Sequence, residues 1–531
     1  MTPPDRSAIL RPLAHDFPNI DSAVAEITRL TAVLTLPKGT IHVISDIHGE
    51  DKKLRHIINN ASGTLRPLVE KLFADIPPAD LQEFLTLTFY PAEVTARLEQ
   101  TLTDPAALRE FARKTLQRQF LLVRTLAARY SLKRALAVFP LEYQQLLAEM
   151  LFAPTTERGD SFEDAIVHEL SRRGSILHLI HLTGRIIRNL AVDELVIGGD
   201  LWDRGPRGDR VVDYLRQQPN VRFIYGNHDV SWLGAALGNE ALMCNVLRIS
   251  LRYRRLAQID EGYSIPLTPL EHLARTVYAD DPAQFFMPKA PGMRPMDVIA
   301  RMQKAAAIMQ FKLEGQMVAR NPHWGLDHRR LLHRINLQNG TVDVDGTTYA
   351  LRDKLFPTLN PDDPYALSPE EQACIDRLKH SFLNSQKLWE HMKYMVAHGS
   401  MHLIRDDNLI FHGCIPVDPA GNFLPLPDPN LSNTLTGKAM FEHINTIILR
   451  ALEERRAHDL DFLWYLWSGP CSPLFGKDRI ATLERDFIAD KKPHEEHKDP
   501  YFTLINDADF CDKVLREFGV DPARGLIGNG Q

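Results

Sequence analysis

Cysteine is scarce in this sequence and forms no recognisable pattern. The five cysteines among 531 residues are odd in number, widely spaced and include no CxxC pair. This spacing argues against a disulfide framework and against a zinc site built from thiolates. We therefore expect a protein of the reducing cytoplasm.

Long apolar runs and a basic stripe are also missing. No stretch of about 18 uncharged apolar residues occurs, and the first residues lack the apolar core of a signal peptide. The net charge is −6 without a basic stripe, so neither a membrane nor nucleic acid is an expected partner. With 44% hydrophobic and 24% charged residues, the composition is that of a globular protein, and the length predicts two to four structural units.

Predicted strands and helices alternate along the chain. Residues 19–36 and 175–190 have apolar residues at helical spacing, and a long helix is expected to start with Asp104 as N-cap and Pro105 in the first turn. Helices are also expected at 438–457 and 477–490, and the region 231–395 is read as mostly helical. Short buried strands are expected in "IHVIS", "ELVIGGD", "VRFIYGNHD" and "NLIFHGC". This alternation predicts an α/β fold.

Unusual polar residues follow each of these four strands. They are Asp46 and His48 in "SDIHGE", Asp200, Asp203 and Arg204 in "GGDLWDRGP", Asn227 and His228 in "YGNHD", and His412 in "FHG". A lone D-x-H is more typical of a solvated turn, and a lone Asn-His-Asp of a helix N-cap. Open α/β sheets place their sites at the carboxyl ends of strands, so the four fragments together predict a metal site.

The residue types in these fragments suit phosphate chemistry. Oxygen and imidazole ligands without thiolates favour Mn, Fe or Zn. Two cations ~3.5–4 Å apart need a bridging carboxylate, for which Asp200 is the natural choice, and they can share a hydroxide and clamp a phosphate. Arg204 offers a planar fork of donors to phosphate oxygens. His228, held by Asp203, can protonate the leaving oxygen.

The order D-x-H, G-D-x-x-D-R-G, G-N-H-D and strand-borne H-G resembles the calcineurin-like metallophosphoesterases. "GDLWDRG" and "GNHD" are most similar to the phosphoprotein-phosphatase branch, but 154 positions separate Asp46 from Asp200, and 185 separate Asn227 from His412. Five segments, one near the start and four in the insertions and later, resemble class III fructose-1,6-bisphosphatase from about residue 20 onward. They are "LPKGTIHVISDIHGE", "AAAIMQFKLEGQMVARNPHW", "FPTLNPDDPYALSPEE", "NLIFHGCIPVD" and the stretch 464–502.

This resemblance implies an architecture. The expected core is a metallophosphoesterase α/β sandwich, with two sheets flanked by helices, interrupted by two large, mainly helical insertions. Its parts are an N-terminal helical segment 1–37, core segments 38–58, 191–240 and 396–531, and insertions 59–190 and 241–395. A sugar-covering cap, an effector site and a homo-oligomer interface all stay open as roles for the insertions.

The resemblance also implies an activity. It implies hydrolysis of the 1-phosphate of fructose 1,6-bisphosphate to fructose 6-phosphate in gluconeogenesis, by a hydroxide that bridges two metals. Manganese is the expected metal, with Fe, Zn or Mg as alternatives. One ion would be held by Asp46, His48 and Asp200, and the other by Asp200, Asn227 and His412.

Two features concern the substrate and the end of the sequence. The basic residues Lys477, Arg485, Lys491 and Lys492 either face the second phosphate or form a solvated helix face. The sequence reads "IGNGQ" where the family carries a further histidine ligand, so Gln531 is expected to weaken the second metal site. Two alternatives therefore stay open: a protein or nucleotide phosphatase of the same superfamily, and a shortened, non-catalytic remnant.

Overall fold

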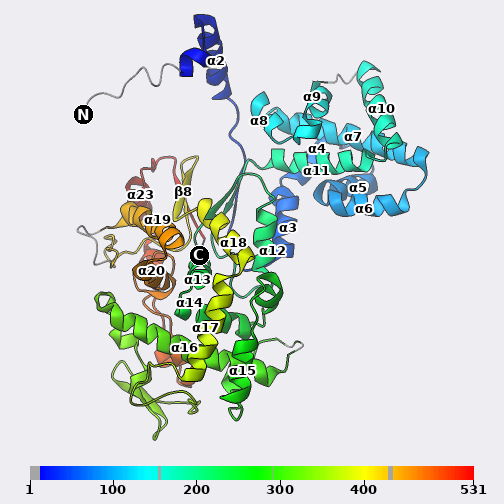
Figure 1. The fold of residues 1–531 in the computed structure, drawn as a ribbon. Coiled ribbons are helices and arrows are strands. Elements are labelled where there is room, and N and C mark those ends of the chain that lie inside the picture. Colours follow the sequence, from blue (N-terminus) through cyan, green and yellow to red (C-terminus); the bar gives the residue numbers. More distant parts are fainter. Residues whose placement is uncertain (1–11, 153–156, 291, 293, 428–434, 531) are drawn as a thin grey trace. The chain divides into compact units, whose positions relative to one another are not determined.

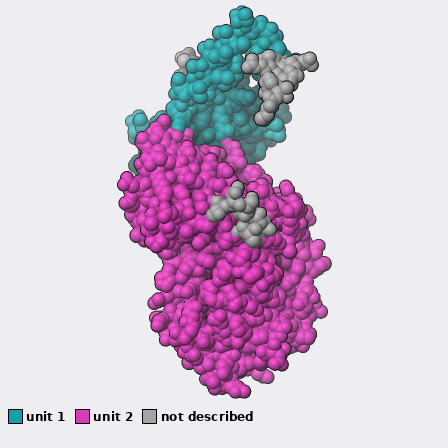
Figure 2. All heavy atoms as spheres, turned by 90° about the vertical axis from the view of Figure 1, so that its left-hand side faces the viewer, with its two compact units in different colours: residues 1–42, 55–194 teal, residues 43–54, 195–531 magenta. Residues whose placement is uncertain are grey.

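The computed structural model describes residues 12–152, 157–290, 292, 294–427 and 435–530, and it has a mixed α/β fold (Figure 1). The α/β class predicted from the alternation of strands and helices is confirmed. The chain divides into two compact units, residues 1–42 with 55–194 and residues 43–54 with 195–531 (Figure 2). Within the described ranges, no helix combines the length and the apolar run needed to cross a bilayer.

Unit 1 is built mainly from helices. The predicted helix at 19–36 is α2 (Ile20–Val33), and the predicted long helix is α7 (Pro105–Ala127). Asp104 caps α7 as expected, because its carboxylate accepts from Ala107 N at 2.9 Å. The other helices of this unit are α4 (Leu65–Leu72), α5 (Pro78–Phe89), α6 (Pro91–Thr101), α8 (Leu132–Ala137), α9 (Gln144–Phe152), α10 (Glu157–Arg172) and α11 (Ile176–Ala191).

Unit 1 has a hydrophobic core of its own. Helix α7 packs along α11, and apolar residues such as Phe120 and Ile180 are fully buried there. The buried Gln119 amide donates to Ile180 O at 3.0 Å, so the core also holds a satisfied polar group. The long segment between the predicted first and second strands is thus a packed body.

The first sheet of unit 2 carries the predicted strand ends. Its order is β1 (Ile41–Ile44), β2 (Glu194–Ile197), β3 (Val221–Ile224) and β7 (Gly399–Ser400). Strand β3 is parallel to both β2 and β7. Strands β2 and β3 are mostly buried apolar residues, as expected for parallel strands covered on both faces. Parallel strands bring their carboxyl ends to one edge.

A second sheet of unit 2 contains the fourth predicted strand. Its order is β10 (Leu526–Asn529), β9 (Asn408–Phe411) and β8 (His402–Arg405), with β10 parallel and β8 antiparallel to β9. Asp406 and Asp407 connect β8 to β9 with positive φ angles of 50° and 64°. Such a two-residue turn matches the right-handed twist of the strands that it joins.

Helices surround these sheets in unit 2. They are α12 (Gly208–Leu215), α13 (Asn227–Ala236), α14 (Glu240–Arg252), α15 (Thr268–Thr276), α16 (Met296–Arg320), α17 (Pro369–Leu383), α18 (Gln386–Ala397), α19 (Gly437–Glu454), α20 (Ala457–Ser468), α21 (Thr482–Phe487), α22 (Tyr501–Leu504) and α23 (Ala508–Glu517); α3 (Asp51–Asn59) begins in unit 2 and ends in unit 1. The helix predicted at 477–490 is shorter than expected, because Lys477 forms an isolated bridge with Lys498 before α21 begins.

One small sheet was not predicted. Strands β4 (Ile335–Asn336), β5 (Thr341–Val344) and β6 (Thr347–Ala350) form an antiparallel sheet inside the region read as mostly helical. Asp345 and Gly346, with φ of 50° and 76°, make the β5–β6 turn. An Asp-Gly pair between alternating residues is a strong hairpin signal, and it outweighs the helical character of the surrounding region.

Helix α16 lies in the interior of unit 2 and carries buried charges. The ammonium of Lys312 is completely buried and donates to Glu371 at 2.7 Å and to Thr358 O at 2.6 Å. Glu371 is buried as well and also accepts from the Ser368 backbone at 2.8 Å, which caps α17. The pair therefore ties α16 to the start of α17 through groups that satisfy one another.

Replacing Lys312 with methionine is expected to destabilise unit 2 by about 3 to 5 kcal/mol, because Glu371 would keep a buried charge without a partner. All six tryptophans lie between residues 202 and 467, so their fluorescence during urea denaturation reports on unit 2 alone. The double variant Lys312→Met with Glu371→Gln should recover much of the loss. A single variant as stable as the wild type would contradict this account.

Candidate metal centre

The loops that follow β1 and β2 are hydrogen-bonded to each other beyond the strands. His48 N donates to Asp200 O at 2.9 Å, and Gly49 N donates to Leu201 O at 2.7 Å. Gly198 N donates back to Ile44 O at 2.8 Å. The two loops therefore hold their side chains in a fixed relation, although more than 150 residues separate them in sequence.

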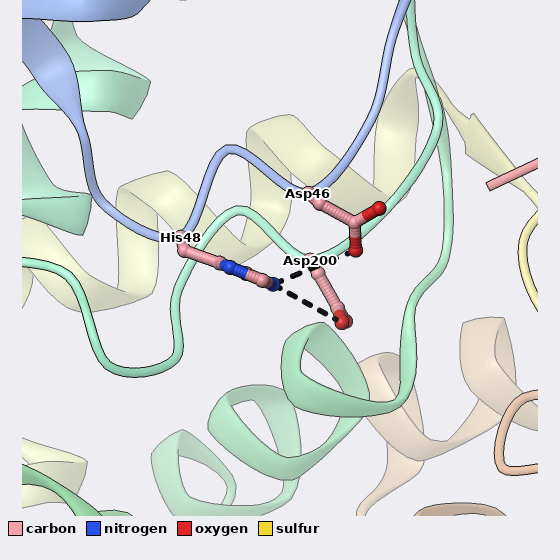
Figure 3. A group of neighbouring side chains, drawn as sticks. All are labelled: Asp46, His48 and Asp200. Carbon is pink, nitrogen blue, oxygen red and sulfur yellow. Dashed lines mark ion pairs between the residues drawn. The ribbon is translucent and has the colours of Figure 1, made fainter. Parts of the chain in front are cut away.

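Asp46, His48 and Asp200 gather at this edge of the sheet, with their side chains directed toward one another (Figure 3). One ligand atom from each residue lies within 4.8 Å of the others. His48 Nε2 is 3.5 Å from Asp46 Oδ1 and 3.8 Å from Asp200 Oδ2. Two carboxylates and an imidazole at this spacing form a donor set suited to a divalent transition metal.

The backbone at these residues is strained. Asp46, His48 and Asp200 have φ angles of 52°, 48° and 56°, and Asp203 has 118°. Each such conformation costs a residue other than glycine about 1 to 3 kcal/mol, and such strain is concentrated at functional sites. The inter-loop hydrogen bonds hold the backbone in this form, so folding places these side chains before any ligand binds.

Two glycines allow the loops to approach closely. A Cβ atom at Gly205 would overlap the carbonyl group of His48, and a Cβ at Gly199 would overlap the His412 ring. Gly199 also has a φ of 99°, which side chains rarely tolerate. Gly199 and Gly205 of "GGDLWDRGP" are thus required by contacts within the site.

His412 also lies beside Asp200, and Asn227 precedes His228, whose backbone N donates to Asp200 Oδ1 at 3.2 Å. His412 Nδ1 is 2.9 Å from Gly198 O, so it carries the proton and leaves the lone pair on Nε2. That Nε2 is 3.6 Å from Asp200 Oδ2. In the described part of the chain, both Nε2 of His412 and Oδ1 of Asn227 are buried without a hydrogen-bond partner. Buried polar atoms without partners are the donors that a cation would satisfy.

Asp203, Arg204 and His228 form a second group beside the ligands. His228 Nε2 is 3.4 Å from Asp203 Oδ1, and Arg204 Nε donates to Asp203 Oδ2 at 2.8 Å. Asp203 is buried, whereas the Arg204 side chain is 58% exposed. One edge of the His228 ring packs against Trp467, with ring centroids 4.8 Å apart. The structure brings together the eight metal-site and catalytic residues that the sequence predicted.

Asp229 also lies at the site, although its position in the sequence predicted no role for it. Its buried carboxylate accepts from the backbone of Asp200 at 2.9 Å, Leu201 at 2.8 Å and Gly226 at 2.9 Å. Burial and the neighbouring Asp200 charge raise the pKa of Asp229 to about 7, and the backbone donors oppose that rise. In the sequence, only the Asp of "GNHD" pointed to this residue. It occupies the N3 position of α13, where an acidic side chain can accept from backbone N–H groups.

The carboxylates of Asp46, Asp200 and Asp203 raise the pKa of His48. Burial alone would lower the pKa of His48, but hydrogen bonds to Asp200 and Asp46 and the charge of Asp203 raise it to about 10. Burial likewise opposes ionisation of Asp200, yet the rings of His412 and His228 keep the pKa of its carboxyl below the ordinary range. The cluster therefore takes up positive charge, as a proton or as a metal.

The basic cluster suggested for the second phosphate is partly neutralised. Lys477 Nζ lies 2.9 Å and Arg485 Nη2 3.0 Å from the carboxylate of Glu496, which is 7% exposed. Lys491 and Lys492 are exposed at a short 3₁₀ turn. The role of these four residues stays a prediction. Gln531, expected at a ligand position, lies outside the described residues.

Comparisons with known proteins point to one family. The model of a family described as Firmicute fructose-1,6-bisphosphatase matches residues 8–531. The chain is 36% identical to the class 3 fructose-1,6-bisphosphatase of Clostridium acetobutylicum, over 98% of this chain and 79% of that protein. The class 3 enzymes of Alkaliphilus metalliredigens and Parabacteroides distasonis are each 37% identical, over 98% of this chain and 80% and 79% of those proteins. No solved structure matches.

Asp229→Asn is expected to weaken Mn²⁺ binding about 10- to 100-fold, because partners that position ligands typically contribute that much. The amide loses the charge and one of the acceptors that hold the Asp200 loop. Calorimetric titration with Mn²⁺ measures the change, and Asp512→Asn on the exposed face of α23 is the matched control. Equal affinities in both variants would exclude the positioning role.

Metal binding should release about one proton near pH 7.5, because His48, with a pKa raised to about 10, is protonated in the metal-free protein and must lose its proton to become a ligand. Affinity should therefore rise about tenfold per pH unit and level off as the pH passes the raised pKa. Calorimetry in buffers of different ionisation enthalpy measures the proton count. No proton release would contradict a ligand role for His48.

Proposed function

The chain belongs to the class 3 fructose-1,6-bisphosphatase family, and from this premise we propose that it hydrolyses fructose 1,6-bisphosphate at the centre around Asp200. The products would be fructose 6-phosphate and phosphate. The observation that carries the proposal is that Asp200 Oδ2 lies 3.8 Å from His48 Nε2 and 3.6 Å from His412 Nε2, while His412 Nε2 and Asn227 Oδ1 have no hydrogen-bond partner among the described residues.

A pair of divalent ions fits these donors, and we propose manganese. The set is made of carboxylate, imidazole and amide groups without thiolate, which favours a metal of intermediate softness. When bound, such ions supply Lewis acidity and lower the pKa of water. The ion held by Asp46, His48 and Asp200 is expected to bind more tightly, because two carboxylates would contact it. The other ion would have only one carboxylate, that of Asp200, beside the neutral Asn227 and His412.

The remaining residues would handle the substrate. The exposed guanidinium of Arg204, oriented by Asp203, is available to donate to phosphate oxygens as the charge on them grows. His228, also within ion-pair distance of Asp203, would donate a proton to the sugar oxygen that leaves. Trp467 covers one edge of the His228 ring and limits its movement.

We further propose that the β1–β2–β3–β7 sheet and the β10–β9–β8 sheet are the two layers of a metallophosphoesterase sandwich. Supporting contacts join their ends: Ser45 Oγ is 3.1 Å from both Gly198 O and Gly530 O, and His412 reaches Gly198 O. The core would then comprise 38–58, 191–240 and 396–531, with insertions at 59–190 and 241–395. A cytoplasmic location in gluconeogenesis and a homo-oligomer belong to the same proposal.

The alternative substrates are less well supported. A protein or nucleotide phosphatase would share the residues around Asp200, but the three relatives described above are named as class 3 fructose-1,6-bisphosphatases and match almost the whole chain. The same matches, with the clustering of Asp46, His48, Asp200 and His412, weigh against a non-catalytic remnant.

Phosphate release from fructose 1,6-bisphosphate with added Mn²⁺ is the direct test. Asp200→Asn should lower kcat at least about 1,000-fold, because the variant loses the carboxylate common to both donor sets. The Asp512→Asn control should match the wild type, and sugar analysis should find fructose 6-phosphate. A wild type that hydrolyses a phosphopeptide but not the bisphosphate would overturn the proposal.

A further inference from the structure

A cationic cluster of four residues lies directly beside the proposed centre. It consists of Arg204, Tyr253, Arg255 and Lys289, and we call it the Tyr253 cluster. Arg255 Nε donates to the backbone oxygen of Arg204 at 2.9 Å. Lys289 Nζ is 3.3 Å from the Tyr253 hydroxyl and 4.6 Å from the centre of the Tyr253 ring.

The fold brings this cluster to the site through two neighbouring helices. Helix α13 starts at the ligand Asn227, and α14 packs against it and ends at Arg252, just before Tyr253. Arg254 has a φ of 59°, which turns the chain at the end of α14. Arg255 N then donates to Ser250 O at 2.7 Å, and this bond fixes the turn.

Tyr253 links this turn to Arg204. Asp203 raises the pKa of the Arg204 guanidinium most strongly, and a hydrogen bond with the Tyr253 hydroxyl adds to that rise. The same hydroxyl is bonded to Lys289. A chain of contacts therefore leads from Asp203 to Arg204, from Arg204 to Tyr253, and from Tyr253 to Lys289, away from the metal ligands.

The charges of the cluster are only partly compensated. Among the described residues, no carboxylate pairs with Arg255 or Lys289. The neighbouring arginines differ, because Arg252 pairs with Asp486 at 3.3 Å and Arg254 donates to the backbone of Ala290 and Arg294. Arg255 and Lys289 are thus cations without a carboxylate partner in the described part of the chain. They lie next to Arg204, the arginine proposed for the reacting phosphate.

We infer that the Tyr253 cluster binds the second phosphate of the sugar bisphosphate, the one that is not hydrolysed. This inference rests on the proposed function. A bisphosphate needs a second anion site within one sugar's length of the first, and Arg255 and Lys289 provide donors at a fixed position next to Arg204. Lys477 and Arg485 serve this purpose less well, because both already hold Glu496.

Steady-state kinetics with two substrates tests the inference. Arg255→Gln and Lys289→Gln should each raise KM for fructose 1,6-bisphosphate about tenfold, because each loses a charge-assisted contact, with kcat within about twofold. KM for p-nitrophenyl phosphate, which has no second phosphate, should stay unchanged. Arg516→Gln, an exposed arginine on α23, is the matched control.

The outcomes separate the subsite from the activity. Unchanged KM for the bisphosphate in both variants would overturn the subsite, as would an equal rise for both substrates. If KM for the bisphosphate rises only in Lys491→Gln and Lys492→Gln, the second phosphate binds at the cluster that contains Lys477 and Arg485, and the inference is wrong. A wild type that hydrolyses only p-nitrophenyl phosphate would overturn the proposed function itself, before any variant is compared.

Discussion

One buried carboxylate holds the proposed centre together. Asp229 accepts three backbone hydrogen bonds, two from the loop after β2 and one from the loop after β3. These bonds fix the backbone of Asp200, whose carboxylate lies near both His48 and His412. Without them, the amides of Asp200 and Leu201 would be buried without acceptors, which costs about 1 to 3 kcal/mol for each group.

That constraint explains why the strain at the site is tolerated. Positive φ angles at Asp46, His48 and Asp200 are unfavourable locally, but hydrogen bonds between the loops and to Asp229 keep each residue in place. The result is a concentration of negative charge whose geometry does not depend on a ligand. Preorganisation of this kind lets a site bind ions and stabilise charge without rearranging during the reaction.

The long segment between β1 and β2 is compatible with this short-range arrangement because it carries its own interior. Unit 1 occupies most of the chain between β1 and β2 and packs around α7 and α11. Helix α14 lies mostly in the region proposed as the second insertion, packs against α13 and leads to Tyr253 and Arg255 beside Arg204. An insertion that contributes residues to the substrate site is one way in which a common metal centre acquires a preference for one substrate.

The sequence by itself determined the α/β class, the four strands that precede the polar tips and the identity of the candidate ligands. These follow from local rules: apolar runs make buried strands, and Asp104 with Pro105 starts a helix. Only the tertiary structure decided that His48 and His412 both approach the Asp200 carboxylate, and that Asp229 ties the loops. It also decided that Lys477 and Arg485 pair with Glu496, while no carboxylate of the described residues pairs with Arg255 or Lys289. Such facts depend on contacts between residues far apart in the chain, and no periodicity or motif records which charges meet once the chain has folded.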